Sequence, residues 1–378
     1  MAPFKSSFAA LVLAFPLLVA SQSCPARPFS LTLRANAALP DPFTNQSALP
    51  TPRARDPPGT LRPKPSSVTG SLSGNTLTVN VTHDGKSISF TASISRPSGT
   101  GPFPAIIALG GASIPIPSGV ATITFNNDYI AQQTNTGSRG KGKFYTIYGS
   151  GHSAAATTAW AWGVGRIIDV LETIQNSPIN VQKLGVTGCS RNGKGALIIG
   201  ALEQRIALTI PQESGAGGAA CWCISDAMKK RNIDVQTAAQ IVTENVWLSP
   251  TFNQYVNRIP DLPIDHHLLA AMVAPRALLV IDRSGIDWLG PESVFGCMKT
   301  GTKVFQALGI ADRMGVSQVG GHNHCQFSSS QTGDVTAFVD KFLKGNANAN
   351  TNIVRMDKAN NAGFVEATWV NWATPSLT

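Results

Sequence analysis

The segment GCSRNGKG, residues 188–195, says most about the fold and chemistry of this chain, because it joins an apolar strand-like run to an apolar helix-like run. A sharp strand-turn-helix elbow of this kind lifts a serine hydroxyl off the edge of a sheet, and small neighbours keep the turn free of clashes. The helix starts directly behind Ser190, so its free N–H groups and its dipole favour an oxyanion there. The segment departs from G-x-S-x-G, since Asn192 takes the place of the second glycine and Gly193 comes one residue later. We interpret Ser190 as a nucleophile, with an ordinary turn as the alternative.

A second motif near the C-terminus, GGHNHC at residues 320–325, supplies candidate bases. Cys189 directly precedes Ser190, and Cys325 directly follows His324. A disulfide between these cysteines would hold their Cα atoms roughly 4.4–6.8 Å apart. It would thereby bring Ser190 and His324 together as nucleophile and base. His322 is the second candidate for the base, because two residues along an extended segment it points to the same side; the alternative is that both cysteines are purely structural.

The N-terminus predicts export from the cell. Residues 1–21 combine an early lysine, an apolar stretch over 9–20 and small residues near the end, which is typical of a secretory signal. The apolar run is too short for a membrane span, and no later stretch is long enough for one. We therefore expect a secreted, extracellular protein without a membrane partner.

Export permits disulfides, so the six cysteines are interpreted as bridges and no metal site is expected. The spacing of Cys221-Trp-Cys223 does not match common zinc knuckles. Two glycosylation sequons, at Asn45 and Asn80, fit the same secretory route.

Charge and proline are concentrated at the N-terminal end. Residues 1–66 hold seven lysines and arginines against two acids, which is +5 of the total formal charge of +9. No nucleic-acid motif accompanies this charge, so it suits an acidic polysaccharide or a solvated surface, and nucleic acid is not an expected partner. Ten of the 25 prolines lie within residues 25–65. We predict an irregular Pro-rich arm over 22–66 and one α/β esterase domain over 67–378.

Hydrophobic periodicity predicts the architecture of that domain. Alternating apolar residues at 77–81 and 88–94, around a turn at 83–86, predict a β-hairpin. Continuous apolar runs predict buried strands, and helices are expected at about 154–174, after the elbow, and at 335–343. The strand-like runs are residues 105–109, 120–125, 184–187, 206–210, 277–281 and 315–319. Such strands alternating with helices predict a three-layer α/β sandwich with a mostly parallel central sheet.

A base histidine needs a carboxylate to orient it, and two acids occupy predicted strand ends. Glu213 follows the strand after the elbow, within a Gly-rich loop, and its longer side chain suits a position on an adjacent strand. Asp282 ends the following strand, which is the usual place for the acid in an α/β-hydrolase. The residues alone leave both open.

Together the segments GCSRNGKGA, PQESGAGG, DWLGP, FGCM and GHNHC resemble the fungal glucuronoyl esterases of carbohydrate esterase family 15, from about residue 65 to the end. The resemblance implies an α/β-hydrolase fold and a carboxylic ester hydrolase without metal or cofactor. It implies cleavage of esters between (4-O-methyl-)glucuronic acid of glucuronoxylan and lignin alcohols. It makes Ser190 the nucleophile, His324 the base and Glu213 the acid, with the guanidinium of Arg191 supplementing backbone N–H groups at the oxyanion.

The resemblance also implies contacts to the sugar and a disulfide scheme. Lys194, Gln236, Glu244 and Trp288 would contact the sugar, and their polar and flat apolar groups suit that role. The spacing of Gln236 and Glu244 predicts that both lie on one face of a helix. Without the resemblance, Lys194 and Glu244 would be solvated charges and Trp288 a core residue. The implied disulfides are Cys189–Cys325 and Cys221–Cys297.

The N-terminal region departs from the family pattern, because residues 45–62 are polar and Pro-rich and contain no cysteine. This leaves Cys24 and Cys223 either to bridge each other or to stay free.

Two other functions fit the same residues. One is a secreted esterase acting on acetyl or feruloyl groups, because a triad does not by itself choose the acyl group. The other is an inactive, glycan-binding relative. For the glucuronoyl esterase we expect a monomer.

Overall fold

The computed structural model describes residues 63–262, 264–357, 363–370 and 373–374. The predicted secretory signal, nearly all of the Pro-rich arm, Cys24 and the sequon at Asn45 lie outside these residues. Asn80, in the second sequon, is exposed on a strand.

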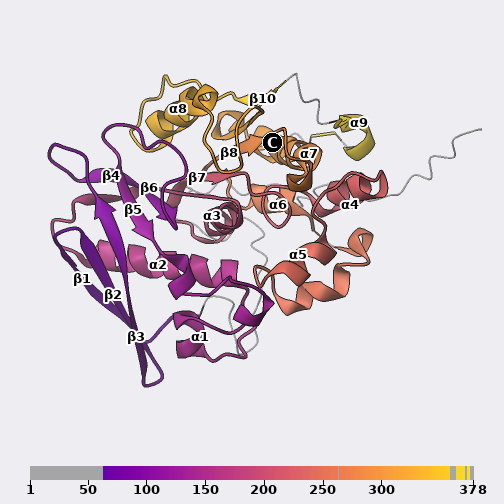
Figure 1. Ribbon diagram of the computed structural model, residues 1–378. Coiled ribbons are helices and arrows are strands. Elements are labelled where there is room, and N and C mark those ends of the chain that lie inside the picture. Colours follow the sequence, from indigo (N-terminus) through magenta and orange to yellow (C-terminus); the bar gives the residue numbers. More distant parts are fainter. Residues whose placement is uncertain (1–62, 263, 358–362, 371–372, 375–378) are drawn as a thin grey trace, which may run out of the picture.

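The described residues form a ten-stranded sheet with the spatial order β1-β2-β3-β5-β4-β6-β7-β8-β9-β10 (Figure 1). Strands β1 to β3 form an antiparallel meander that joins β5, and the strands from β5 across to β10 are parallel. The predicted hairpin and the mostly parallel sheet are therefore confirmed. The strand bounds are β1 Ser67–Ser73, β2 Thr76–His83, β3 Lys86–Ser95, β4 Phe103–Leu109, β5 Ala121–Phe125, β6 Ile179–Cys189, β7 Ile206–Gln212, β8 Ala277–Arg283, β9 Met314–Val319 and β10 Val354–Met356.

Helices cover both faces of the sheet, as the three-layer prediction requires. On one face, α2 and α3 pack against β6, and α7 packs against β8 and β9; α8 packs against β7 and β8 from the other side. The helix bounds are α1 Lys143–Tyr148, α2 Ala156–Thr173, α3 Arg191–Leu202, α4 Trp222–Lys230, α5 Ala238–Glu244, α6 His266–Ala271, α7 Pro291–Ala307, α8 Thr332–Phe342 and α9 Glu366–Trp369. Within the described ranges, none of these helices has the length and apolar character needed to cross a bilayer.

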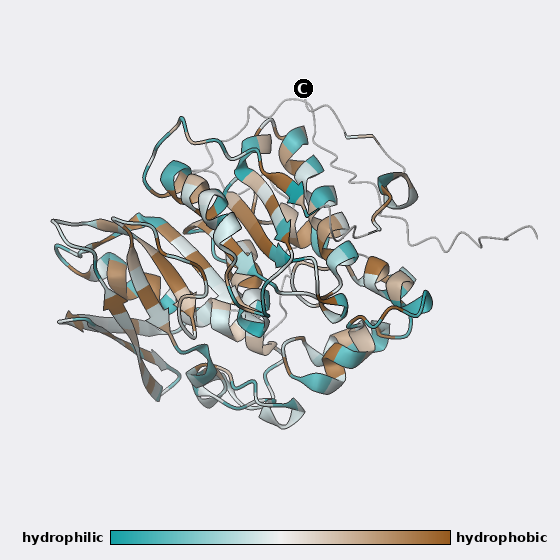
Figure 2. Cartoon of the chain, turned by 45° about the horizontal axis from the view of Figure 1, so that its top comes forward, coloured by the Kyte–Doolittle hydropathy of each residue, from teal (hydrophilic) through white to brown (hydrophobic). Residues whose placement is uncertain are grey.

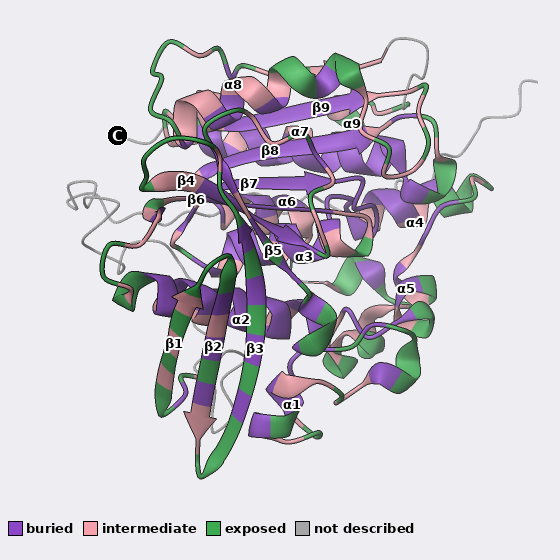
Figure 3. Cartoon of the chain, turned by 60° about the vertical axis from the view of Figure 1, so that its left-hand side comes forward, coloured by how far each residue is buried: buried purple, intermediate pink, exposed green. Residues whose placement is uncertain are grey.

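The continuous apolar runs become strands that are buried on both faces. In β4, Ile107 joins the core beneath α2, while its neighbour Ile106 joins the core beneath α8. The central strands are accordingly largely apolar (Figure 2) and buried, whereas buried positions alternate with less buried ones along β2 and β3, and β1 alternates between intermediate and exposed positions (Figure 3). Because the parallel strands end at one edge, the loops that follow β6, β7, β8 and β9 gather there.

Candidate active site

Ser190 lies at a strained elbow between β6, which ends at Cys189, and α3, which begins at Arg191. Its backbone has φ 57° and ψ −123°, a conformation that non-glycine residues rarely adopt. Two glycines make the elbow possible. A Cβ on Gly188 would lie 2.6 Å from the backbone oxygen of Asn192, and one on Gly193 would lie 2.5 Å from that of Gln212. The closest approach to the neighbouring strand therefore falls at Gly193, which explains why the second glycine comes one residue late.

The side chain of Asn192 ties the elbow to the end of β4. Its Nδ2 donates to the backbone oxygen of Leu109 at 3.0 Å. Its Oδ1 accepts from Asn127 Nδ2 at 3.1 Å and from Gln133 Nε2 at 3.2 Å. A glycine could not make these hydrogen bonds, so the departure from G-x-S-x-G fixes the start of α3 against the neighbouring loops.

Glu213 directly follows β7 and reaches the histidine segment from a left-handed backbone with φ 45°. Its Oε2 accepts from His324 Nδ1 at 2.7 Å and from the backbone N–H of Cys325 at 2.9 Å. Burial opposes ionisation of this carboxyl, but the hydrogen bonds from His324 and Cys325 outweigh it, so the pKa of Glu213 lies below its usual value. Glu213 is therefore an anion held against His324.

The two candidate histidines differ in what their ring nitrogens contact. His322 Nε2 lies 3.2 Å from Glu213 Oε1, and its Nδ1 lies 3.2 Å from the backbone oxygen of Gly320. In His324, Nδ1 is taken by Glu213, while Nε2 is buried and has no hydrogen-bond partner among the described residues. Only His324 thus keeps a ring nitrogen available to accept a proton, which favours it over His322 as the base.

Asp282, the other candidate acid, lies buried in a different environment from Glu213. It is 1% exposed, and its Oδ2 accepts from Gln318 Nε2 at 2.7 Å. Burial raises the pKa of Asp282 to about 8. In the described chain its side-chain hydrogen bond goes to Gln318 and not to a histidine, so the geometry favours Glu213 as the orienting carboxylate.

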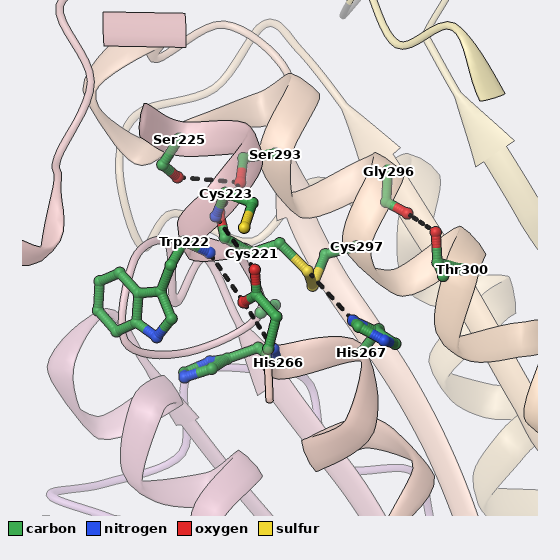
Figure 4. The surroundings of a disulfide bond; sticks show 12 residues. Cys221, Trp222, Cys223, Ser225, His266, His267, Ser293, Gly296, Cys297 and Thr300 are labelled. Atoms are coloured by element: carbon green, nitrogen blue, oxygen red, sulfur yellow. Dashed lines mark hydrogen bonds between the residues drawn. A yellow bond between two sulfur atoms is a disulfide. The ribbon is translucent and has the colours of Figure 1, made fainter. Parts of the chain in front are cut away.

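Two disulfides brace this part of the molecule. Cys189 and Cys325 are bonded with their Cα atoms 5.7 Å apart, which joins the residue before Ser190 to the residue after His324. Cys221 and Cys297 are bonded with Cα atoms 5.2 Å apart and join the start of α4 to α7 (Figure 4). Cys223 is also disulfide-bonded.

In the described chain, the groups of Cys and His side chains close enough to share a metal ion both contain one of these disulfides. A cysteine binds a metal ion as a thiolate, and a disulfide-bonded sulfur is not a thiolate. One group consists of Cys221, His267 and Cys297, with His267 Nδ1 3.8 Å from Cys221 Sγ. These groups are therefore not thiolate metal sites.

Lys194, one turn into α3, is a buried cation beside the elbow. Its Nζ donates to the backbone oxygens of Ser214 at 2.6 Å and Ala216 at 2.8 Å, and it lies 5.2 Å from the ring centroid of Trp247. Burial lowers the pKa of Lys194 to about 7, although the negative charge of Glu244 acts in the opposite sense. The alternative that Lys194 is a solvated charge is therefore wrong.

Arg191 is exposed, and its guanidinium contacts Trp247 and Gln133, two residues that the sequence analysis did not single out. Its carbon Cζ lies 5.5 Å from the ring centroid of Trp247, and Nη1 donates to the backbone oxygen of Gln133 at 3.3 Å. Trp247 is buried, and its Nε1 donates to Gln133 Oε1 at 2.9 Å. No local motif marks Trp247 or Gln133, since only the fold brings them to the elbow.

The expectation that Gln236 and Glu244 lie on one helix face is wrong. Helix α5 begins at Ala238 after the cap Thr237, so Gln236 lies in the preceding loop. The two side chains nevertheless meet, because Gln236 Nε2 donates to Glu244 Oε2 at 3.0 Å. The Oε1 of Gln236 is buried and has no partner among the described residues.

Trp288 is held beside the histidine and is not a core residue. Its backbone oxygen accepts from the N–H of Gln236 at 2.9 Å. Trp288 is 39% exposed, and its ring centroid lies 5.7 Å from that of His324 in a T-shaped arrangement. An exposed indole at this place presents a flat apolar face next to the candidate base.

Comparison with known sequences gives one consistent result. The family described as "Glucuronyl esterase, fungi" matches residues 79–309. A 4-O-methyl-glucuronoyl methylesterase of Hypocrea jecorina is 54% identical over 371 residues, which cover 94% of this chain and 79% of the relative. One of Schizophyllum commune is 46% identical over 384 residues, covering 97% of this chain and 98% of that protein.

Solved structures agree. The glucuronoyl esterase catalytic domain from Hypocrea jecorina superposes with a TM-score of 0.81 at 58% identity, covering 85% of this chain and 87% of that one. A serine-to-alanine mutant of a glucuronoyl esterase from Sporotrichum thermophile, in complex with methyl 4-O-methyl-β-D-glucopyranuronate, has a TM-score of 0.81 at 55% identity, covering 85% and 86%.

This fold and its relatives define a carboxylic ester hydrolase of the α/β-hydrolase type. The chain belongs to the family of fungal glucuronyl esterases, and the resemblance seen in its motifs is confirmed.

Proposed function

We propose that this chain hydrolyses esters between (4-O-methyl-)glucuronic acid of glucuronoxylan and lignin alcohols, through a triad of Ser190, His324 and Glu213. The observation that carries the proposal is the 2.7 Å hydrogen bond from His324 to the buried Glu213, on a segment bonded covalently to the residue before Ser190. The bound methyl glucopyranuronate of a relative at 55% identity supports the substrate class.

In the proposed reaction, Ser190 Oγ attacks the ester carbonyl while His324 Nε2 takes its proton. The negative oxygen of the tetrahedral intermediate is stabilised by the N–H groups at the start of α3 and by the Arg191 guanidinium. The intermediate collapses to an acyl-enzyme, and His324 returns the proton to the departing alcohol. Water then attacks the acyl-enzyme with His324 again as the base, which releases glucuronate and restores Ser190.

Lys194, Gln236, Glu244 and Trp288 are proposed to bind the sugar on the acyl side. Two N–H groups of Lys194 donate to backbone carbonyls, so its ammonium keeps a third donor for a sugar hydroxyl.

The proposal also includes a secretory signal at 1–21, an N-terminal arm at 22–66, and an extracellular, monomeric enzyme. The test is hydrolysis of a methyl 4-O-methyl-glucuronate beside an aryl acetate and a feruloyl ester. Activity on the latter two alone would overturn the substrate class, and no labelling by a serine-directed phosphonate would indicate a binding protein.

We expect the activity on glucuronate esters to fall as the pH rises and Lys194 loses its charge. Above a pH of about 7 Lys194 loses its proton, and the two N–H groups that remain are both needed by the carbonyls of Ser214 and Ala216. KM for a glucuronate ester should therefore rise through this range. Lys194→Met should lower kcat/KM for that ester by roughly 5- to 150-fold below pH 7 and abolish the rise. An aryl acetate, which lacks the hydroxyls, is the control; equal losses on both substrates would contradict a sugar contact.

Removing the Cys189–Cys325 disulfide should weaken both the fold and the reaction. We expect Cys189→Ala with Cys325→Ala to lower the free energy of unfolding by about 2–5 kcal/mol and also to lower kcat, because the base is no longer tethered beside the elbow. Denaturant unfolding and steady-state kinetics measure the two effects. The matched control is Cys221→Ala with Cys297→Ala, which should lower stability with a much smaller change in kcat. A similar kcat loss in both pairs would show that the first disulfide has no special role in the reaction.

A further inference from the structure

We propose that His322 is a positioning residue for ester hydrolysis, which fixes the Glu213 carboxylate through Oε1 while His324 is bound at Oε2. The inference rests on the proposed triad and assigns a role to a histidine that the triad does not use.

The contacts of Glu213 divide between its two oxygens. Oε2 accepts from His324 Nδ1 and from the backbone of Cys325. Oε1 accepts from His322 Nε2 at 3.2 Å and from Gln212 Nε2 at 3.3 Å. The Glu213 side chain is 0% exposed and that of His322 is 6% exposed, so solvent does not replace a donor that is lost. His322 therefore makes the shorter of the two hydrogen bonds that anchor Oε1.

Glu213 needs such an anchor because its own backbone does not fix its carboxylate. It lies just beyond the end of β7 with φ 45°, and three side-chain torsions separate its backbone from the oxygens. Loss of the shorter of the two hydrogen bonds at the buried Oε1 is costly and favours rotation of the carboxylate. Rotation about the terminal torsion would also turn Oε2 away from His324, so the contact at Oε1 controls the geometry at the base.

The ring of His322 is oriented for this role and not for accepting a proton from serine. Both of its nitrogens face acceptors, Glu213 Oε1 and the backbone oxygen of Gly320. Contact with a carboxylate requires an N–H at Nε2, whether the ring is neutral or cationic. When both nitrogens carry a hydrogen, Nδ1 also donates to the backbone oxygen of Gly320, which holds the ring plane and aims the Nε2 N–H at Glu213.

The test separates a donor at Nε2 from mere packing. His322→Leu keeps the bulk without a donor, and we expect kcat to fall by roughly 10- to 100-fold with KM nearly unchanged. Gln places an amide nitrogen near the position of Nε2, so His322→Gln should restore kcat to within a few-fold of the wild type. Asn is too short to reach Glu213, so His322→Asn should behave like the leucine variant. Asn323→Ala, at an exposed residue between the two histidines, controls for disturbance of the loop.

Repeating these substitutions with Glu213→Ala makes the test decisive. If His322 acts through Glu213, His322→Leu should cause no further loss of kcat in that background. An equal loss in both backgrounds, or a wild-type kcat for His322→Asn, would overturn the inference. If Glu213→Ala alone kept full activity, the proposed triad itself would fail, which is a different outcome from a failure at His322.

Discussion

Ser190→Ala is expected to lower kcat for a methyl glucuronate ester by roughly four to six orders of magnitude while the protein stays folded. The hydroxyl is the proposed attacking group, and its loss leaves only stabilisation of the transition state by the remaining donors. The elbow itself should survive, because alanine adds no atoms at a backbone with φ 57°. The measurements are steady-state kinetics, circular dichroism and labelling by a serine-directed phosphonate, which should disappear.

A matched control for this substitution is Ser330→Ala, at an exposed serine just before α8, which should change neither kinetics nor labelling. Retention of more than a few per cent of wild-type activity by Ser190→Ala would refute its assignment as the nucleophile.

Glu213→Ala should lower kcat by roughly three to four orders of magnitude, whereas Asp282→Asn should leave it within a few-fold. Glu213 is an anion bound to His324, and its loss removes both the orientation of the ring and the charge that stabilises the imidazolium. Asp282 is protonated below a pH of about 8, and asparagine resembles a neutral acid that still accepts from Gln318. A larger loss at Asp282 would reverse the choice of acid.

The same pair should differ in how stability depends on pH. The folded pKa of Asp282 is raised, so between about pH 4 and 8 the folded state holds a proton that the unfolded chain releases, and stability falls as pH rises. Asp282→Asn should lack that slope. The folded pKa of Glu213 is lowered, so its contribution is present above the unfolded pKa and is lost as pH falls through the folded pKa. Denaturant unfolding from pH values below the unfolded pKa of Glu213 up to about pH 8 measures both slopes.

Much of the central sheet could be predicted because it depends on local patterns. Continuous apolar runs such as 105–109 are fully removed from water only when both faces of the sheet are covered, and they form parallel strands. Strand β1 was not predicted, since its sequence SVTGSLS is mostly small and polar and pairs only because β2 lies beside it. Gln236 was misplaced because the spacing of two residues does not show where a helix begins, which here the cap at Thr237 decides.

The elbow at Ser190, the cysteines that flank the candidate nucleophile and base, and the alternation of strands and helices could all be predicted, because each depends on consecutive residues. Which side chains meet became clear in the folded chain alone. The fold gave His324 and His322 one carboxylate, set Asp282 apart with Gln318, and buried Lys194 beside Trp247. Burial, hydrogen bonding and pKa depend on groups that are distant in the chain; Glu213 and His324, for example, are 111 residues apart. No local pattern could therefore specify them.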